Sequence, residues 1–196
     1  MPKLSVSCVL AAVFTVPAVH AACWQPVLGG SKIIFTASQA GAPMQGTFHQ
    51  YDAKLCLDGT GGTLQVSVQT ASVDTQLAEL DDALRGEDFF DAKRWPTAVF
   101  QSDSLKSLGN GRYQLTGKLT IRDQTREITL PFTWTPAPDG NSAMLVGQFA
   151  LKRLDYKVGQ GQWADTQWVG DPVGLAFSIL FKSAAAKSSS PHPTRP

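Results

Sequence analysis

The segment YQLTGKLTI, residues 113–121, alternates apolar or small residues with polar ones along its whole length. The segment ITLPFTW, residues 128–134, repeats the alternation, and so do residues 64–69 and 173–181. A period of two is typical of a β-strand that has one buried and one solvated face. The sequence therefore predicts an all-β protein built from antiparallel strands.

Turn-forming residues separate these segments at Gly61-Gly62, Asn110-Gly111 and Asp139-Gly140-Asn141. Asn-Gly and Asp-Gly between alternating segments are typical of β-hairpins. The predicted strands are residues 31–38, 46–57, 63–71, 97–106, 112–121, 125–135, 143–152 and 173–182. Eight antiparallel strands can close into a barrel, which leaves no exposed sheet edge. A two-sheet sandwich is the alternative, because periodicity does not distinguish the two architectures.

One stretch departs from the alternation. Leu77, Leu80 and Leu84 follow helical spacing, and Gly86 comes just after them. This pattern predicts a short amphipathic helix at residues 75–84, between the third and fourth strands. The helix either plugs one end of the barrel as part of the core or forms a lid over an internal pocket.

The composition of the 196-residue chain suits one domain: 43% of the residues are apolar, 17% are charged and the net charge is +1. The apolar fraction is too high for a disordered chain. A near-neutral chain without a basic cluster has no electrostatic footprint for nucleic acid.

Residues 1–21 have the composition of a cleaved signal peptide. Lys3 supplies a positive charge, residues 8–16 are almost wholly apolar, and Val19-His20-Ala21 is a small-residue cleavage pattern. The apolar run is shorter than the about 20 residues that a membrane span needs. We therefore predict an exported protein, with a barrel domain at residues 22–183 and a disordered tail at residues 184–196, which holds three Ser and three Pro.

Cleavage after residue 21 leaves two cysteines, Cys23 and Cys56, in a compartment that permits oxidation. We predict a disulfide between them, which the chain-entropy model values at roughly 3 to 4 kcal/mol. In the alternative, Cys23 is a lipidated N-terminus, since it follows Ala21-Ala22; His20, however, stands where an apolar residue is expected.

The predicted barrel domain has few groups for catalysis. His49 is its only histidine, and alternation places this side chain on the outer face, so a Ser/His/Asp triad has no good basis. No set of Cys and His residues has metal-ligand spacing. The sequence predicts a protein that is not an enzyme and has no metal site.

Six blocks of sequence carry a resemblance to a known family. They are GTF at 46–48, DFFD at 88–91, WPT at 95–97, FQS at 100–102, GKLTIR at 117–122 and RLDYKVGQGQW at 153–163. In order and spacing, across residues 31–182, these blocks resemble the YceI-like family. The resemblance implies a lipocalin-like, eight-stranded periplasmic barrel that holds a polyisoprenoid, such as a quinone tail or a prenyl diphosphate, and no other cofactor.

The chain departs from the family pattern at several positions. Leu80 and Ala83 stand where many members carry an arginine and a histidine, which makes the helix more apolar. Asp123 occupies a hairpin position where a small residue is usual.

Residues turned inward by alternation or by helical spacing are candidates to contact the lipid. They are Phe35, Phe48, Val66, Val68, Leu80, Leu84, Phe89, Phe90, Leu119, Leu130, Phe132, Phe149, Leu151 and Phe177. Arg85 and Arg153 are candidate contacts of a polar head group. Burial contributes about 0.8 kcal/mol per methylene, so we expect affinity to grow with chain length.

These observations predict a periplasmic lipid-binding or carrier protein. One alternative is an accessory partner that holds quinone for a membrane redox protein. Another is a barrel enzyme that acts on an isoprenoid with Arg85 or Arg153 near the head group. A homodimer is a further partnership that the sequence leaves open.

Overall fold

The computed structural model describes residues 22–57 and 61–184. The predicted signal peptide, residues 1–21, lies outside the described residues, and so does the predicted tail from residue 185 onward.

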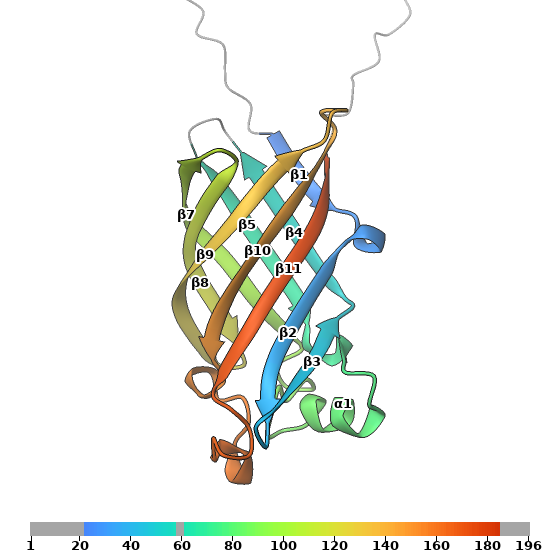
Figure 1. The fold of residues 1–196 in the computed structure, drawn as a ribbon, viewed down its shortest axis with the longest axis vertical. Helices are drawn as coiled ribbons and strands as arrows, with labels where there is room; N and C mark the ends of the chain where they lie inside the picture. Colours follow the sequence, from blue (N-terminus) through green and yellow to red (C-terminus); the bar gives the residue numbers. More distant parts are fainter. Residues whose placement is uncertain (1–21, 58–60, 185–196) are drawn as a thin grey trace, which may run out of the picture.

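The described residues form a closed antiparallel β-barrel with one short α-helix, as predicted (Figure 1). The strands are β1 (Ala22–Pro26), β2 (Lys32–Gln39), β3 (Ala42–Phe48), β4 (Tyr51–Leu57), β5 (Gly62–Gln69), β6 (Val73–Asp74), β7 (Thr97–Gly109), β8 (Arg112–Ile121), β9 (Gln124–Pro136), β10 (Ser142–Lys152) and β11 (Pro172–Ser183). Their order in the sheet is β1-β4-β5-β7-β8-β9-β10-β11-β2-β3-β6, and a further pairing between β1 and β11 closes the ring. The sandwich alternative is therefore wrong.

These strands occupy eight positions around the barrel, because three positions are interrupted. β1 and β2 lie in line along β11: β1 pairs with residues 181–183, and β2 pairs with residues 174–178. A 3-10 turn at Leu28–Gly30 separates the two strands. In the same way β3 and β4 share one position, and β5 and β6 share another.

The predicted strand at 46–57 is wrong as a single element, since it breaks at His49 and Gln50. On one side the chain keeps its neighbour across the break: His49 N donates to Ser72 O, and Gln69 N donates to Gln50 O. On the other side the partner changes from β2 to β1. The bend follows from that change of partner, which a local alternation pattern does not show.

The end of the barrel that carries β1 is filled with side chains. Trp24 meets Trp134 edge to face with ring centroids 5.2 Å apart, and Trp134 contacts Phe181 at 5.8 Å. The predicted disulfide is confirmed: Cys23 on β1 and Cys56 on β4 are directly paired, with Cα atoms 4.0 Å apart. Aromatic packing and a covalent link therefore close this end, which we call the closed end.

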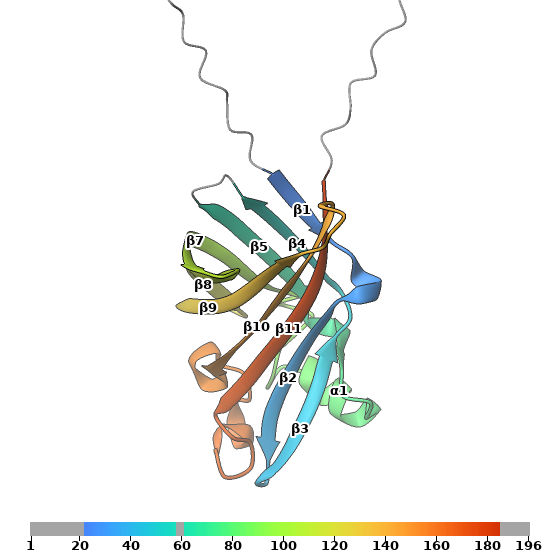
Figure 2. The same ribbon diagram turned by 45° about the horizontal axis from the view of Figure 1, so that its top comes forward.

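The helix α1 (Ala78–Arg85) lies at the opposite end of the barrel beside β3 (Figures 1 and 2). It confirms the predicted helix between the third and fourth predicted strands, but it begins later. Leu77 precedes the helix and is 63% exposed, so its predicted place on the buried face is wrong. Leu80 and Leu84 do pack against the core. None of the helices in the described part of the chain has the length and apolar character needed for a bilayer crossing.

Candidate functional site

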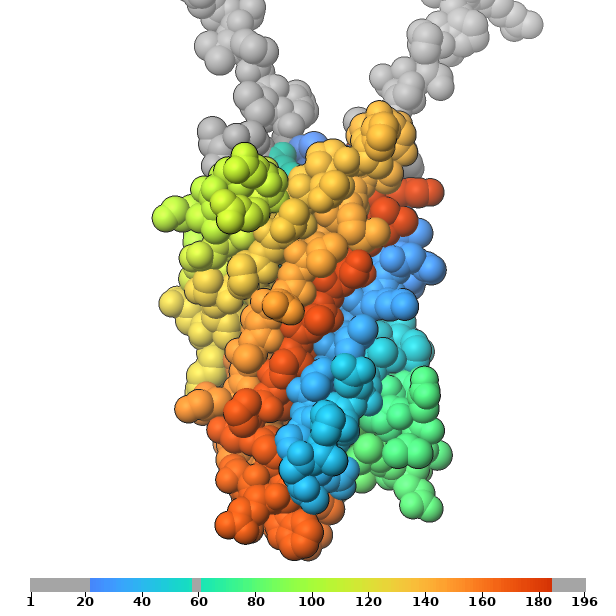
Figure 3. Space-filling view, in the orientation of Figure 1, coloured from blue at the N-terminus to red at the C-terminus, as the bar shows by residue number. Residues whose placement is uncertain are grey.

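The barrel interior contains a cavity of about 230 Å³ on the α1 side of the closed end. Strands β2, β3, β5, β7, β8, β9, β10 and β11 contribute to its wall. Helix α1 and the loops that contain residues 89 and 158 contribute as well. Its lining is almost wholly apolar, with Gln39, Thr70, Arg153 and Tyr156 as the main polar residues. Figure 3 shows the outer wall, where β9, β10, β11 and β2 lie side by side.

Most of the residues predicted to contact a lipid line this cavity. They are Phe35, Phe48, Val66, Val68, Leu80, Leu84, Phe89, Phe90, Leu119, Leu130, Phe149, Leu151 and Phe177. Their contact with a ligand remains a prediction, but the fold brings them to one space. Aromatic contacts tie the lining together: the Phe48 ring lies 5.7 Å from both Phe35 and Phe90.

Phe132 is the exception. Its side chain faces inward and is buried, but it stacks on Tyr113 with centroids 5.4 Å apart and does not line the cavity. It lies two residues beyond Leu130 along β9, toward the closed end. Alternation identifies the inner face of a strand but not the level along the barrel at which packing gives way to a cavity.

Several lining residues escaped prediction. Ile33, Phe100 and Leu175 lie on strands, where the same alternation places them inward. Tyr156 and Trp163 come from 3-10 turns after β10, and no periodic pattern marks such positions. The Trp163 ring contacts Phe89 at 5.7 Å, so these turns cover the cavity from one side.

Arg153 lies at the cavity wall, but its guanidinium faces the backbone of the turns around it. It is 3% exposed, and all five of its N–H groups donate to carbonyl oxygens at 2.6 to 3.0 Å. The acceptors are Val158, Gly159, Trp163, Val169 and Gly170. Burial lowers the pKa of Arg153, and the charge of Asp171 opposes that shift. Arg153 therefore has no N–H left for a ligand head group in this structure.

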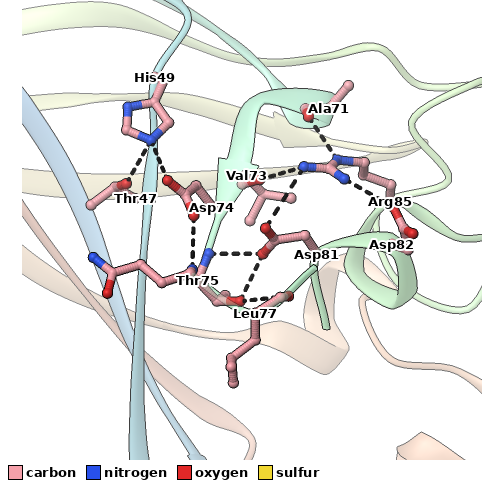
Figure 4. A network of polar contacts seen from close by, with 11 residues as sticks. Thr47, His49, Ala71, Val73, Asp74, Thr75, Leu77, Asp81, Asp82 and Arg85 are labelled. Atoms are coloured by element: carbon pink, nitrogen blue, oxygen red, sulfur yellow. Dashed lines mark hydrogen bonds and ion pairs between the residues drawn. The ribbon is translucent and has the colours of Figure 1, made fainter. Parts of the chain in front are cut away.

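Arg85 also donates hydrogen bonds to backbone carbonyls, and it does not line the cavity. Its Nε donates to Ala71 O at 2.9 Å, Nη2 donates to Val73 O at 2.8 Å, and Nη1 donates to Asp82 at 3.0 Å (Figure 4). These bonds tie the last turn of α1 to the chain around β6. Arg85 thus anchors the helix that covers the cavity.

The start of α1 is fixed by the buried carboxylate of Asp81, which is 7% exposed. Its Oδ1 accepts from Thr75 N at 2.8 Å and from Thr75 Oγ1 at 2.7 Å (Figure 4). Since no side chain caps the helix at Leu77, this carboxylate holds the approach to the helix instead.

His49 lies on the outer surface, as alternation predicts, and joins β3 to β6. Its Nε2 is 2.7 Å from Asp74 Oδ2, and the two side chains are 62% and 39% exposed (Figure 4). The hydrogen bond from His49, followed by one from Gln76 N, lowers the pKa of Asp74. In the residues that the structure describes, no three His, Cys, Asp or Glu side chains are placed to hold a metal ion.

Asp123, the departure in the β8–β9 hairpin, has a partner. Its Oδ2 lies 2.8 Å from Lys157 Nζ, and this hydrogen bond lowers the pKa of Asp123 from 3.8 to about 2. Next to it, Arg122 Nη1 donates to Phe89 O and Lys157 O at 2.6 and 2.8 Å. These contacts join the β8–β9 hairpin to the turn that follows β10.

Together the fold and the cavity define a small antiparallel barrel with one closed end and an apolar interior. Residues 24–181 match the YceI-like domain, so the chain belongs to the YceI-like family.

Relatives agree with this assignment. A UPF0312 protein of Vibrio cholerae is 32% identical over 169 residues, which is 81% of this chain and 89% of the relative. A UPF0312 protein of Ectopseudomonas mendocina is 37% identical over 90 residues, which is 44% of this chain. That alignment spans 47% of the Ectopseudomonas protein, and the alignment with a Shewanella denitrificans UPF0312 protein spans 54% of that protein. The chain therefore aligns with about half the length of each of these two relatives.

Solved structures share the fold. BcnA of Burkholderia cenocepacia is 32% identical, with a TM-score of 0.74 over 79% of this chain and 98% of BcnA. A domain from Saccharophagus degradans, described as polyisoprenoid-binding, has a TM-score of 0.65 over 82% of this chain and 98% of that domain. At 13% identity, the second likeness shows the fold alone.

Proposed function

We propose that the protein is a periplasmic binding or carrier protein that holds a polyisoprenoid chain in the barrel cavity. The observation that carries this proposal is the almost wholly apolar lining of a cavity of about 230 Å³ inside a packed barrel. Apolar cavities exclude water and accept apolar molecules, and one of about 150 Å³ is enough to hold benzene. The lining therefore favours a hydrocarbon chain over a polar solute.

The ligand class draws support from two directions. A polyisoprenoid has no charge along its chain, so inward rows of Phe, Leu and Val suffice to hold it, and each buried methylene contributes about 0.8 kcal/mol. The Saccharophagus domain with the same fold is described as polyisoprenoid-binding.

The periplasmic location is supported by two features of the chain. The Cys23–Cys56 disulfide suits an oxidising compartment. The composition of residues 1–21 is that of a signal peptide. Fractionation of the native host tests the location, and recovery of the protein in the cytoplasm would contradict it.

The alternative hypothesis is an enzyme that uses Arg85 or Arg153 near the head group of an isoprenoid. The geometry does not support it, because both side chains donate hydrogen bonds to backbone carbonyls. The carrier reading does not require either side chain at the ligand.

The test is to extract the protein purified from its native host and to identify bound lipid by mass spectrometry. We expect a prenyl lipid, and we expect prenols to bind the delipidated protein more tightly as their chains lengthen. Absence of both bound lipid and prenol binding would refute the proposal.

A matched pair of variants places the ligand. Val68→Phe adds a ring inside the cavity and should weaken prenol binding, since the ring takes space that the chain needs. Val146→Phe adds the same ring on the outer face, where Val146 is 46% exposed, and should leave binding unchanged. Equal effects of the two variants would place the ligand elsewhere.

A further inference from the structure

The wall of the cavity contains a seam where two neighbouring strands are not paired. β9 and β10 are paired only from Pro136–Ala143 to Phe132–Gly147. β9 continues to Gln124 and β10 to Lys152, and the two strands diverge below their shared hairpin (Figure 2). We call this interval, residues 124–131 facing residues 148–152, the seam.

Pro131 accounts for the end of the ladder. A Cβ built on Gly147 would lie 2.5 Å from Pro131 O, so the carbonyl of Pro131 faces β10. In a strand the N and O atoms of one residue point to the same side. The nitrogen of Pro131, which has no hydrogen, therefore faces β10 and cannot continue the ladder there.

The seam borders the cavity on both sides. Ile128 and Leu130 on β9 and Phe149 and Leu151 on β10 all line it. Side chains close the seam in the space-filling view, and no hole is visible there (Figure 3). Beyond the Phe132–Gly147 pair, side chains and not a backbone ladder fill the space between β9 and β10.

The seam also reaches solvent at its foot. Arg126 on β9 is paired with Leu119 on β8 and therefore shares its side of the sheet, which is the cavity side. Leu119 is only 8% exposed, whereas Arg126 is exposed. The solvent-exposed Lys157–Asp123 ion pair lies next to this foot, between the β8–β9 hairpin and the turn that follows β10.

Tyr156 sits at this foot with an unused hydroxyl. It ends the 3-10 turn that follows β10 and packs against β9, and it lines the cavity. The residue is 2% exposed, and its hydroxyl has no hydrogen-bond partner among the residues that the structure describes. A ligand oxygen that accepts a hydrogen bond from this hydroxyl gains affinity, since the almost wholly apolar lining around it does not use the donor.

The charge state of Tyr156 suits a donor. Burial is the largest influence on the Tyr156 hydroxyl and raises its pKa, while the positive charge of Arg126 acts in the opposite direction. The phenol therefore stays protonated at neutral pH. By contrast, the N–H groups of Arg153 at the same wall are all engaged.

We propose that the seam between β9 and β10 is the end-group site of the cavity, where the Tyr156 hydroxyl donates a hydrogen bond to an oxygen of the ligand head group. The ligand class is an isoprenoid chain that ends in a hydroxyl or carbonyl oxygen. This inference rests on the proposed function and deepens it, because it gives the bound chain a direction.

The test compares two probes of equal carbon number, farnesol and β-farnesene, of which only farnesol carries an oxygen. Their affinities are measured by displacement of N-phenyl-1-naphthylamine fluorescence from the delipidated protein. Tyr156→Phe should weaken farnesol binding about two- to tenfold, the value of one hydrogen bond, and leave β-farnesene binding unchanged. Tyr113→Phe, at the stacked Tyr113–Phe132 pair outside the cavity, is the matched control and should affect neither probe.

The outcomes separate the two proposals. If wild-type protein binds neither probe nor longer prenols, the proposed function fails. If it binds both but Tyr156→Phe leaves farnesol unaffected, the end-group site is wrong. An equal loss for both probes overturns it as well, since Tyr156 would then act only through packing.

Discussion

Replacement of Arg153 by methionine should destabilise the protein strongly. Methionine keeps much of the length of the side chain but removes all five N–H donors. Three of the carbonyls that they serve, those of Val158, Gly159 and Val169, are bonded in buried surroundings. The other two bonds, to Trp163 and Gly170, are part-buried, so water can replace the arginine there.

The size of the effect follows from this division. A buried acceptor that loses its partner costs about 1 to 3 kcal/mol, and the lower half of that range suits carbonyls in turns that can relax. Three such groups give a loss of about 4 kcal/mol in the free energy of unfolding. For a domain of this size the melting temperature should fall by about 8 to 16 °C.

The assay is urea unfolding followed by tryptophan fluorescence. Arg112→Met is the matched control, since Arg112 is exposed on β8, and it should change stability by no more than about 0.5 kcal/mol. Gly159→Ala should also destabilise, because Gly159 has φ of 80° and a Cβ there would overlap Nη1 of Arg153. If Arg153→Met unfolded like the wild type but lost prenol affinity, the reasoning would be refuted and Arg153 would be a head-group contact.

Three further outcomes are expected. Replacing Cys23 and Cys56 by alanine should lower the free energy of unfolding by about 4 kcal/mol, since the disulfide closes a loop across a separation of 33 residues. Thermal unfolding measures this loss, and an unchanged melting temperature would contradict it. Asp123→Asn should lower stability relative to wild type above about pH 4, and the difference should vanish as the pH falls toward 2, because a folded-state pKa held below its unfolded value stabilises only while the carboxylate is charged. Urea midpoints at several pH values test this, and a pH-independent difference would exclude the Lys157 pair as its cause. Thr70→Val should cost about 1 kcal/mol in urea unfolding, since the Thr70 residue is 1% exposed and its single hydroxyl hydrogen is shared between the carbonyls of Trp95 and Pro96. An unchanged urea midpoint would mean that this hydrogen bond adds nothing to stability.

The strands were predictable because alternation is a local property of a sheet with one wet face. Alternation failed at the barrel positions that two short strands share, because the neighbouring strand changes along such a position. β1 is five residues long, and β6 has only two, so neither offers a pattern to read. The break at His49 likewise depends on a strand that is distant in the sequence.

The site was predictable in kind but not in its polar details. Sequence spacing put Phe35 and Phe89 inward, where they line the cavity. It could not show that five carbonyls of one turn region converge on Arg153, since their positions depend on the path of a non-periodic loop. Nor could it single out Tyr156, whose hydroxyl is left without an acceptor by the path that the described loops take around it.

Closure of the ring between β1, β2 and β11 has a consequence for how the barrel forms. Leu180 N donates to Ser31 Oγ, a contact that spans 149 residues of chain. Pairings between such distant segments form slowly, because the entropy of a long loop must be lost before they stabilise anything. The wall of the cavity thus needs residues from both ends of the domain, because β2 and β11 line it side by side. An N-terminal portion of the chain that lacks β11 cannot enclose the cavity.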